Sequence, residues 1–177
     1  KVGFLGDHAK RLGQRLLVGA ISTPIAISAD LGHALAHTES ARRSGAPMDA
    51  VVLGADMPRT LYHNNAVPPW VHRLRALGGP IFNAFGLLIS LIWRKFAPPG
   101  SLTRELADIS TVSHGMIFAG SLAPLPIVDG GTILKWSLIE EGISEDQAED
   151  HMRRIRNGFI AWILAGITAF LVFRRRK

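Results

Sequence analysis

Four mainly apolar stretches follow one another along the chain. They run from about residue 16 to 37, 80 to 96, 109 to 125 and 159 to 173. A helix needs roughly 20 apolar residues to cross a bilayer, and several of these stretches are short and interrupted by Ser, Thr, Gly or His. Because small residues let helix backbones approach closely within a membrane, the pattern predicts about four transmembrane helices that pack on one another. A soluble protein made of buried helices is the alternative.

The polar segments between these stretches carry structure of their own. The run "DAVVLG" (49–54) predicts a short strand, and "PPWVHRLRAL" (68–77) predicts a helix with proline in its first turn. Ser144 and Gln147 form a capping box, so a helix begins there and continues into the fourth stretch. We find no internal repeat. The sequence therefore predicts one all-α membrane domain over residues 1–177, with a short strand in the loop between the first two spans.

The charge of the chain points to a membrane surface. There are 20 Lys and Arg against 14 Asp and Glu, giving a net charge of +6. The bases cluster beside apolar stretches, which favours anionic lipid headgroups over nucleic acid. In a four-span protein most of them fall on one side, with both termini, and the positive-inside rule places that side in the cytoplasm. We therefore expect a multi-pass integral membrane protein that contacts lipid and other transmembrane helices or subunits of a membrane complex.

Three ionisable residues lie on one face of the first stretch. Asp30, His33 and His37 follow at i, i+3 and i+7. Ionisable groups within a membrane helix are costly and usually face the interior of the bundle, so a functional role is the default hypothesis. The alternative is a buried Asp–His pair with a structural role only.

A second candidate group follows the third stretch, in "SLAPLPIVDGG" (121–131). Pro124 and Pro126 break the helix, so we expect an extended or turned chain at Asp129, near the membrane interface. A carboxylate there is placed to coordinate a cation. The alternative is a simple turn in which Asp129 is the N-cap of the next helix. The chain has no cysteine, which excludes thiolate metal sites.

Together these motifs resemble the site-2 protease family of intramembrane zinc metalloproteases. The segment "ADLGHALA" (29–36) aligns with the family's H-E-L-G-H-A-L-A helix, and "ARRSGAPMDAVVLG" and "GGPIFN" (78–83) follow in the family's order. The segment ending in "PLPIVDGG" is similar to the family's N-x-x-P-x-P-x-x-D-G-G motif, with Ser121 in place of its asparagine. The resemblance extends from about residue 16 to 173, and it implies that His33 and Asp129 are remnant zinc ligands.

The departures from the family fall on the catalytic residues. In this alignment the first histidine is replaced by Ala29 and the general base, a glutamate, by Asp30, which is one methylene shorter. A second frame pairs His33 with His37 at i, i+4, a spacing that also suits zinc. Its base position is then Ala34, which cannot act as a base. A working site would need Asp30 as ligand or base, with His37 as a substitute ligand or His114 moving in.

The resemblance therefore implies a catalytically inactive homologue, a structural or helix-binding subunit of a membrane assembly that holds no cofactor. The first alternative is an active protease with a variant zinc site made of Asp30, His33, Asp129 and His37. The second is a haem- or chlorophyll-binding subunit of an energy-transducing complex, with His33, His37 or His114 as the axial ligand.

Overall fold

A computed structural model describes residues 12–54 and 58–175 of the chain. The chain is mainly helical, as expected. Its elements are α2 (Leu12–Arg43), β1 (Ala50–Val52), β2 (Arg59–Leu61), α3 (Pro69–Phe96), α4 (Leu102–Ser121), α5 (Asp129–Glu140) and α6 (Glu145–Arg175). The strand expected within 49–54 is β1, which pairs antiparallel with β2 so that Val51 lies opposite Thr60.

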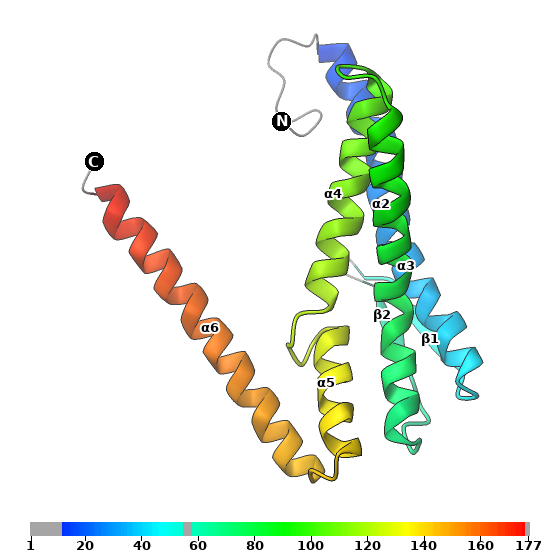
Figure 1. Cartoon of the computed structure of the whole chain (residues 1–177), viewed down its shortest axis with the longest axis vertical. Helices are drawn as coiled ribbons and strands as arrows, with labels where there is room; N and C mark the ends of the chain where they lie inside the picture. The colour runs from blue at the N-terminus through cyan, green and yellow to red at the C-terminus, as the bar shows by residue number, and fades with distance from the viewer. Residues whose placement is uncertain (1–11, 55–57, 176–177) are drawn as a thin grey trace.

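The core of the molecule is a bundle with α3 at its centre. Helix α3 packs against α2, α4 and α5, and α2 also packs against α4. In Figure 1, α2 runs down the bundle, α3 returns, and α4 runs down again with α5 continuing beneath it. Small residues allow the close packing of α2 on α3, because a Cβ on Gly78 would lie 2.5 Å from the carbonyl oxygen of Ala36.

Two of the expected helices merge with the stretches that follow them. Helix α3 begins at Pro69 and continues through Pro80 to Phe96, so the helix expected at 68–77 and the second apolar stretch are one element. Helix α6 begins just after Ser144, whose Oγ accepts a hydrogen bond from Gln147 N at 3.4 Å. It runs on through the fourth stretch, as the sequence predicted.

Three of the described helices, α2, α3 and α6, are long and apolar enough to cross a membrane. This finding supports a multi-pass integral membrane protein. The expected third span (109–125) is not among them: it falls on α4, which ends at Ser121 and carries Arg104, Glu105 and Asp108 in its first two turns. The terminal bases at 1–11 and 176–177 that entered the topology prediction lie outside the described residues.

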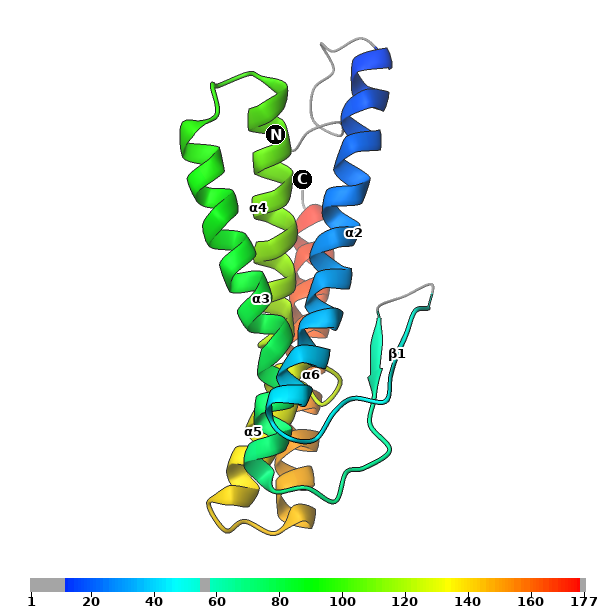
Figure 2. The ribbon, with the colours of Figure 1, turned by 90° about the vertical axis from the view of Figure 1, so that its right-hand side faces the viewer.

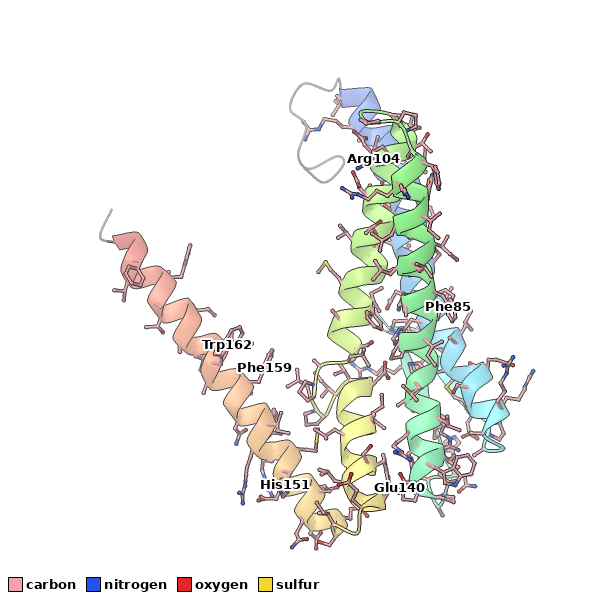
Figure 3. All side chains as sticks on the ribbon, in the orientation of Figure 1. Phe85, Arg104, Glu140, His151, Phe159 and Trp162 are labelled. Carbon is pink, nitrogen blue, oxygen red and sulfur yellow. The ribbon has the colours of Figure 1, made fainter. Side chains whose placement is uncertain are left out.

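Helix α6 leaves the bundle after its first turns. It packs mainly on α5, and its apolar half is exposed along its length, with Trp162 72% exposed. Figure 1 shows α6 diverging from the other helices, and in Figure 2 it lies behind α2 and α4. Figure 3 shows Phe159 and Trp162 extending from it with no other helix against them. Exposed apolar surface of this extent is expected to contact lipid or another membrane helix.

Candidate metal centre

His33, His37 and Asp129 converge at one point in the bundle. His33 Nε2 lies 3.2 Å from His37 Nε2, and the Asp129 carboxylate lies 3.1 Å from the first and 3.3 Å from the second. All three side chains are largely buried. Among the residues that the structure describes, they form the one group of His, Cys, Asp or Glu whose ligand atoms gather within 4.8 Å.

Two different local structures bring these residues together. On α2 the i, i+4 spacing places both imidazoles on the same face. Asp129 is the first residue of α5 and follows Val128, which is extended (φ −127°, ψ 169°) and is the N-cap. The alternative that Asp129 is itself the N-cap is therefore wrong. Pro124 and Pro126 interrupt the helical run after α4, so a new helix, α5, can begin at Asp129.

Gly130 and Gly131 allow Asp129 to approach the site. A Cβ at Gly130 would overlap the carbonyl of Leu122, and one at Gly131 would overlap the carbonyl of Leu125. Since both glycines lie outside the positive-φ region, the reason for glycine here is close packing and not backbone conformation. This close packing fixes the start of α5 against the preceding loop.

Hydrogen bonds on the far side of each imidazole orient its Nε2 toward the cluster. His37 Nδ1–H donates to the carbonyl oxygen of Arg75 at 2.7 Å, which leaves Nε2 with a free lone pair. The Asn83 amide lies between His33 Nδ1 (2.7 Å) and His114 Nδ1 (2.6 Å). Asn83 Nδ2 donates to His33 Nδ1 and Asn83 Oδ1 accepts from His114 Nδ1–H, so the Nε2 of His33 carries the proton. Metal binding at this Nε2 requires the Asn83 amide to rotate by 180°, which places its oxygen on His33 and its nitrogen on His114. Such outer hydrogen bonds are typical of metal-binding histidines.

The Asp129 carboxylate contacts both imidazoles, with one oxygen against each Nε2. An ionised carboxylate beside two imidazoles is a ligand set that zinc accepts.

The separations of the ligand atoms fit a tetrahedral ion. With metal–ligand bonds of about 2.0–2.1 Å, the ligand atoms of a tetrahedral zinc site lie about 3.3 Å apart. The two Nε2 atoms are 3.2 Å apart. The carboxylate reaches a similar distance through different oxygens, Oδ2 at 3.1 Å from His33 and Oδ1 at 3.3 Å from His37. Space for the ion depends on Gly79, because a Cβ there would overlap His33 Nε2 and lie 2.5 Å from His37 Nε2. The residues present therefore fit a bound zinc ion.

A cavity of about 260 Å³ adjoins the cluster, and both His37 and Asp129 line it. A fourth metal ligand can therefore enter from this side, and catalytic zinc sites keep such a position open. Apart from Asp129, no carboxylate of the described residues lines the cavity. Its lining is His37, Thr60, Tyr62, Asn65, His72, Arg75, Ala76, Asp129 and Thr132.

Of the residues that the sequence singled out, His33, Asp129 and the substitute His37 come together, whereas Asp30 does not join the cluster. The two histidines beside Asp129 are thus His33 and His37, as in the second of the two possible alignments with the family's motif. In that alignment the position of the general base is Ala34, which is only 3% exposed. His114 is not a ligand and acts on the site through Asn83.

Sequence reasoning missed the roles of four residues at the site: Tyr62, Arg75, Gly79 and Asn83. Gly79 and Asn83 lie in the segment "GGPIFN", which was noted only for its resemblance. Tyr62 and Arg75 carry no local signal, since both reach the cavity only because the chain after β2 places the Tyr62 ring against Arg75 of α3.

No protein-family model matches this chain, and a comparison with curated proteins finds no match. The function is therefore inferred from the site itself and from the resemblance of its motifs.

Proposed function

We propose that this chain is a zinc-binding, catalytically inactive homologue of site-2 proteases that holds a transmembrane helix or completes a membrane assembly. The observation that carries this proposal is the convergence of His33 Nε2, His37 Nε2 and the Asp129 carboxylate, with contacts of 3.1 to 3.3 Å between the three groups. An H-x-x-x-H pair on one core helix and a D-G-G aspartate after a broken helix are the ligand pattern of that family, here in the second frame.

The absence of a carboxylate at the family's base position argues against hydrolysis by that family's mechanism. Zinc-dependent hydrolysis needs a group that takes the proton of the attacking water. The residue after His33 is Ala34, and Asp30 lies outside the cluster. In the described part of the chain, the adjoining cavity offers no carboxylate except the ligand Asp129. The residues of the site can therefore hold an ion and a bound ligand, and they lack the carboxylate base with which the family cleaves its substrate.

A role in binding other helices is supported by α6. Its apolar half is exposed, and it stands apart from α2, α3 and α4. In a membrane, partner helices or lipid would cover this surface, since apolar patches of this size mark interaction sites.

We further propose four crossings of the membrane, the third made by α4 and α5 in series. The two helices follow the same direction down the bundle, so α6 returns to the end where α2 begins. Both chain ends would then share one side, which the excess of basic residues assigns to the cytoplasm.

The second candidate is an active metalloprotease that uses the same three ligands. The cavity beside His37 and Asp129 favours it, because a substrate carbonyl or a water could reach the ion there. Haem or chlorophyll binding has less support, since both Nε2 atoms face Asp129 and the α3 backbone at Gly79 leaves no room for a macrocycle.

The metal content of the purified protein tests the proposal. Protein purified in detergent without added metal is expected to contain about one zinc per chain. Asp129→Ala should lose it, whereas the matched control Asp30→Ala, which removes a carboxylate from the same bundle, should retain it. Zinc that is absent from the wild type, or unchanged in Asp129→Ala, would overturn the metal site. Cleavage of a membrane peptide that stops on chelation would favour the protease.

A further inference from the structure

A buried cation without a carboxylate partner lies beside the metal centre. Arg75 is only 3% exposed, and its Nε and Nη1 donate to the carbonyl oxygens of Ala46 (3.0 Å) and Asn64 (3.2 Å). The ring of Tyr62 covers the guanidinium at 4.4 Å. No carboxylate of the described residues forms an ion pair with Arg75. A buried charge is costly unless an opposite charge compensates it.

Arg75 shares its cavity with several hydrogen-bonding groups and with two of the metal ligands. His72 is 7% exposed and stacks on Trp136, with ring centroids 3.7 Å apart, while its Nε2 has no hydrogen-bond partner. Burial, with a smaller effect of Asp129, raises the pKa of Tyr62 despite the opposing effects of Thr60 and Arg75. Its hydroxyl therefore stays protonated and can act as a donor.

The charges around this cavity do not balance when a metal is bound. A divalent ion on two neutral imidazoles and the Asp129 carboxylate keeps one positive charge, and Arg75 adds a second. Ala34, at the position of the family's glutamate, adds no negative charge to balance the metal. Opposite charges attract strongly in a poorly solvated site. An anion is therefore favoured over water as the fourth metal ligand.

We propose that this cavity binds a small carboxylate, with one oxygen on the metal and the other toward Arg75 and Tyr62. Because the metal supplies half of the positive charge, this inference rests on the proposed function. Two oxygens on one planar group match an ion on one side and a guanidinium on the other. The cavity of about 260 Å³ exceeds the roughly 30 Å³ that one water occupies, so a small organic acid fits.

A cobalt-substituted protein tests this inference. Tetrahedral Co²⁺ has visible absorption bands that respond to a change of ligand, so the bands report the metal site itself. Titration with acetate and benzoate is expected to change these bands with saturation, at dissociation constants of roughly millimolar magnitude. A cobalt spectrum that does not respond to either acid overturns the carboxylate site alone, whereas a protein that binds no cobalt overturns the metal centre as well.

Two variants place the carboxylate in the cavity. Arg75→Met should weaken acetate binding at least about tenfold, a change of about 1.4 kcal/mol, while cobalt still binds. The matched control Arg73→Met removes a neighbouring arginine of α3 that pairs with Glu140 outside the cavity, and it should leave acetate binding unchanged. Since Arg75 also holds the loop at Ala46 and Asn64, Tyr62→Phe provides an independent variant and should weaken binding less. Unchanged acetate binding in both cavity variants overturns the assignment.

Two further binding experiments identify the source and the chemical class of the anion. A short peptide with a free C-terminus that binds more tightly than acetate, while its amidated form does not bind, identifies a chain end as the source of the carboxylate. Stronger binding by acetate or benzoate indicates a free small acid. Inorganic phosphate that displaces acetate at lower concentration overturns the choice of carboxylate.

Discussion

Gly79 controls the space in which the ligand atoms meet. A Cβ there would overlap His33 Nε2, so Gly79→Ala is expected to push the imidazoles apart and to remove bound zinc while the helices still form. Zinc content and thermal unfolding of the purified variant would be compared with Gly115→Ala, where the added Cβ would meet only Leu87 Cδ1 at 3.6 Å. Zinc retained at wild-type affinity in Gly79→Ala would contradict the placement of the ion.

Asn83 is a positioning residue for His33. Its side chain is fully buried and joins His33 to His114. Loss of such an outer partner typically lowers metal affinity about 10- to 100-fold, so we expect Asn83→Ala to weaken zinc binding by that factor in a competition assay with a chelator. The control Ser90→Ala removes the Ser90–Ser110 hydrogen bond (2.7 Å), also between α3 and α4. Equal losses in both variants would indicate a general packing effect.

At the residue scale, the sequence predicted which side chains converge better than it predicted their surroundings. His33, His37 and Asp129 were all named, because histidine spacing and a carboxylate after a broken helix are local patterns. Whether Asp30 or His37 joins His33 and Asp129 could not be predicted, because both lie on the same helical face in the sequence. The packing of the helices places His37 in the cluster. Arg75 and Tyr62 could not be predicted, because their contact joins α3 to the chain that follows β2 and depends on the tertiary fold.

At the scale of elements, a lysine joins α5 to α6. Lys135 Nζ lies 2.9 Å from Glu145 and 2.8 Å from Glu149. Both glutamates are more than half exposed, so solvent screens the two ion pairs and they contribute little to stability.

We expect Lys135→Met to widen the range of α5–α6 distances without changing zinc content. Because the chain has no cysteine, spin labels on Ser137→Cys and Met152→Cys would measure this distance directly. The control Lys95→Met lies at the far end of α3 and should leave the distribution unchanged. A distribution as narrow in Lys135→Met as in the wild type would show that apolar contacts alone hold α6.

Helix boundaries were predictable where a local signal marks them. The cap at Ser144 and the proline at Pro69 both mark true helix starts. The third stretch was harder: residues 109–125 are apolar enough to suggest a span, but the helix breaks at Ser121 and its first turns are charged. Hydropathy averages across such a break and cannot locate it.

For the whole molecule, the number of crossings decides the sidedness of the loops. If α4 and α5 cross in series, the α3–α4 loop and the α5–α6 loop lie on opposite sides of the membrane. Pro99→Cys and Glu141→Cys in intact vesicles should then react with an impermeant maleimide from opposite sides. If the two single-cysteine variants react from the same side, the chain does not cross the membrane four times, and three crossings remain.

The ligands come from helices that are far apart in the sequence, with α3 and α4 between them. An ion that binds α2 and α5 together would act as a cross-link, and closing a long stretch of chain stabilises a fold chiefly by restricting its unfolded state. The complete site can also form only late in synthesis, because the ribosome must translate Asp129 before all three side chains are present. Metal loading would thus distinguish a finished chain from a stalled one, and the nascent helices would remain open to rearrangement until that moment.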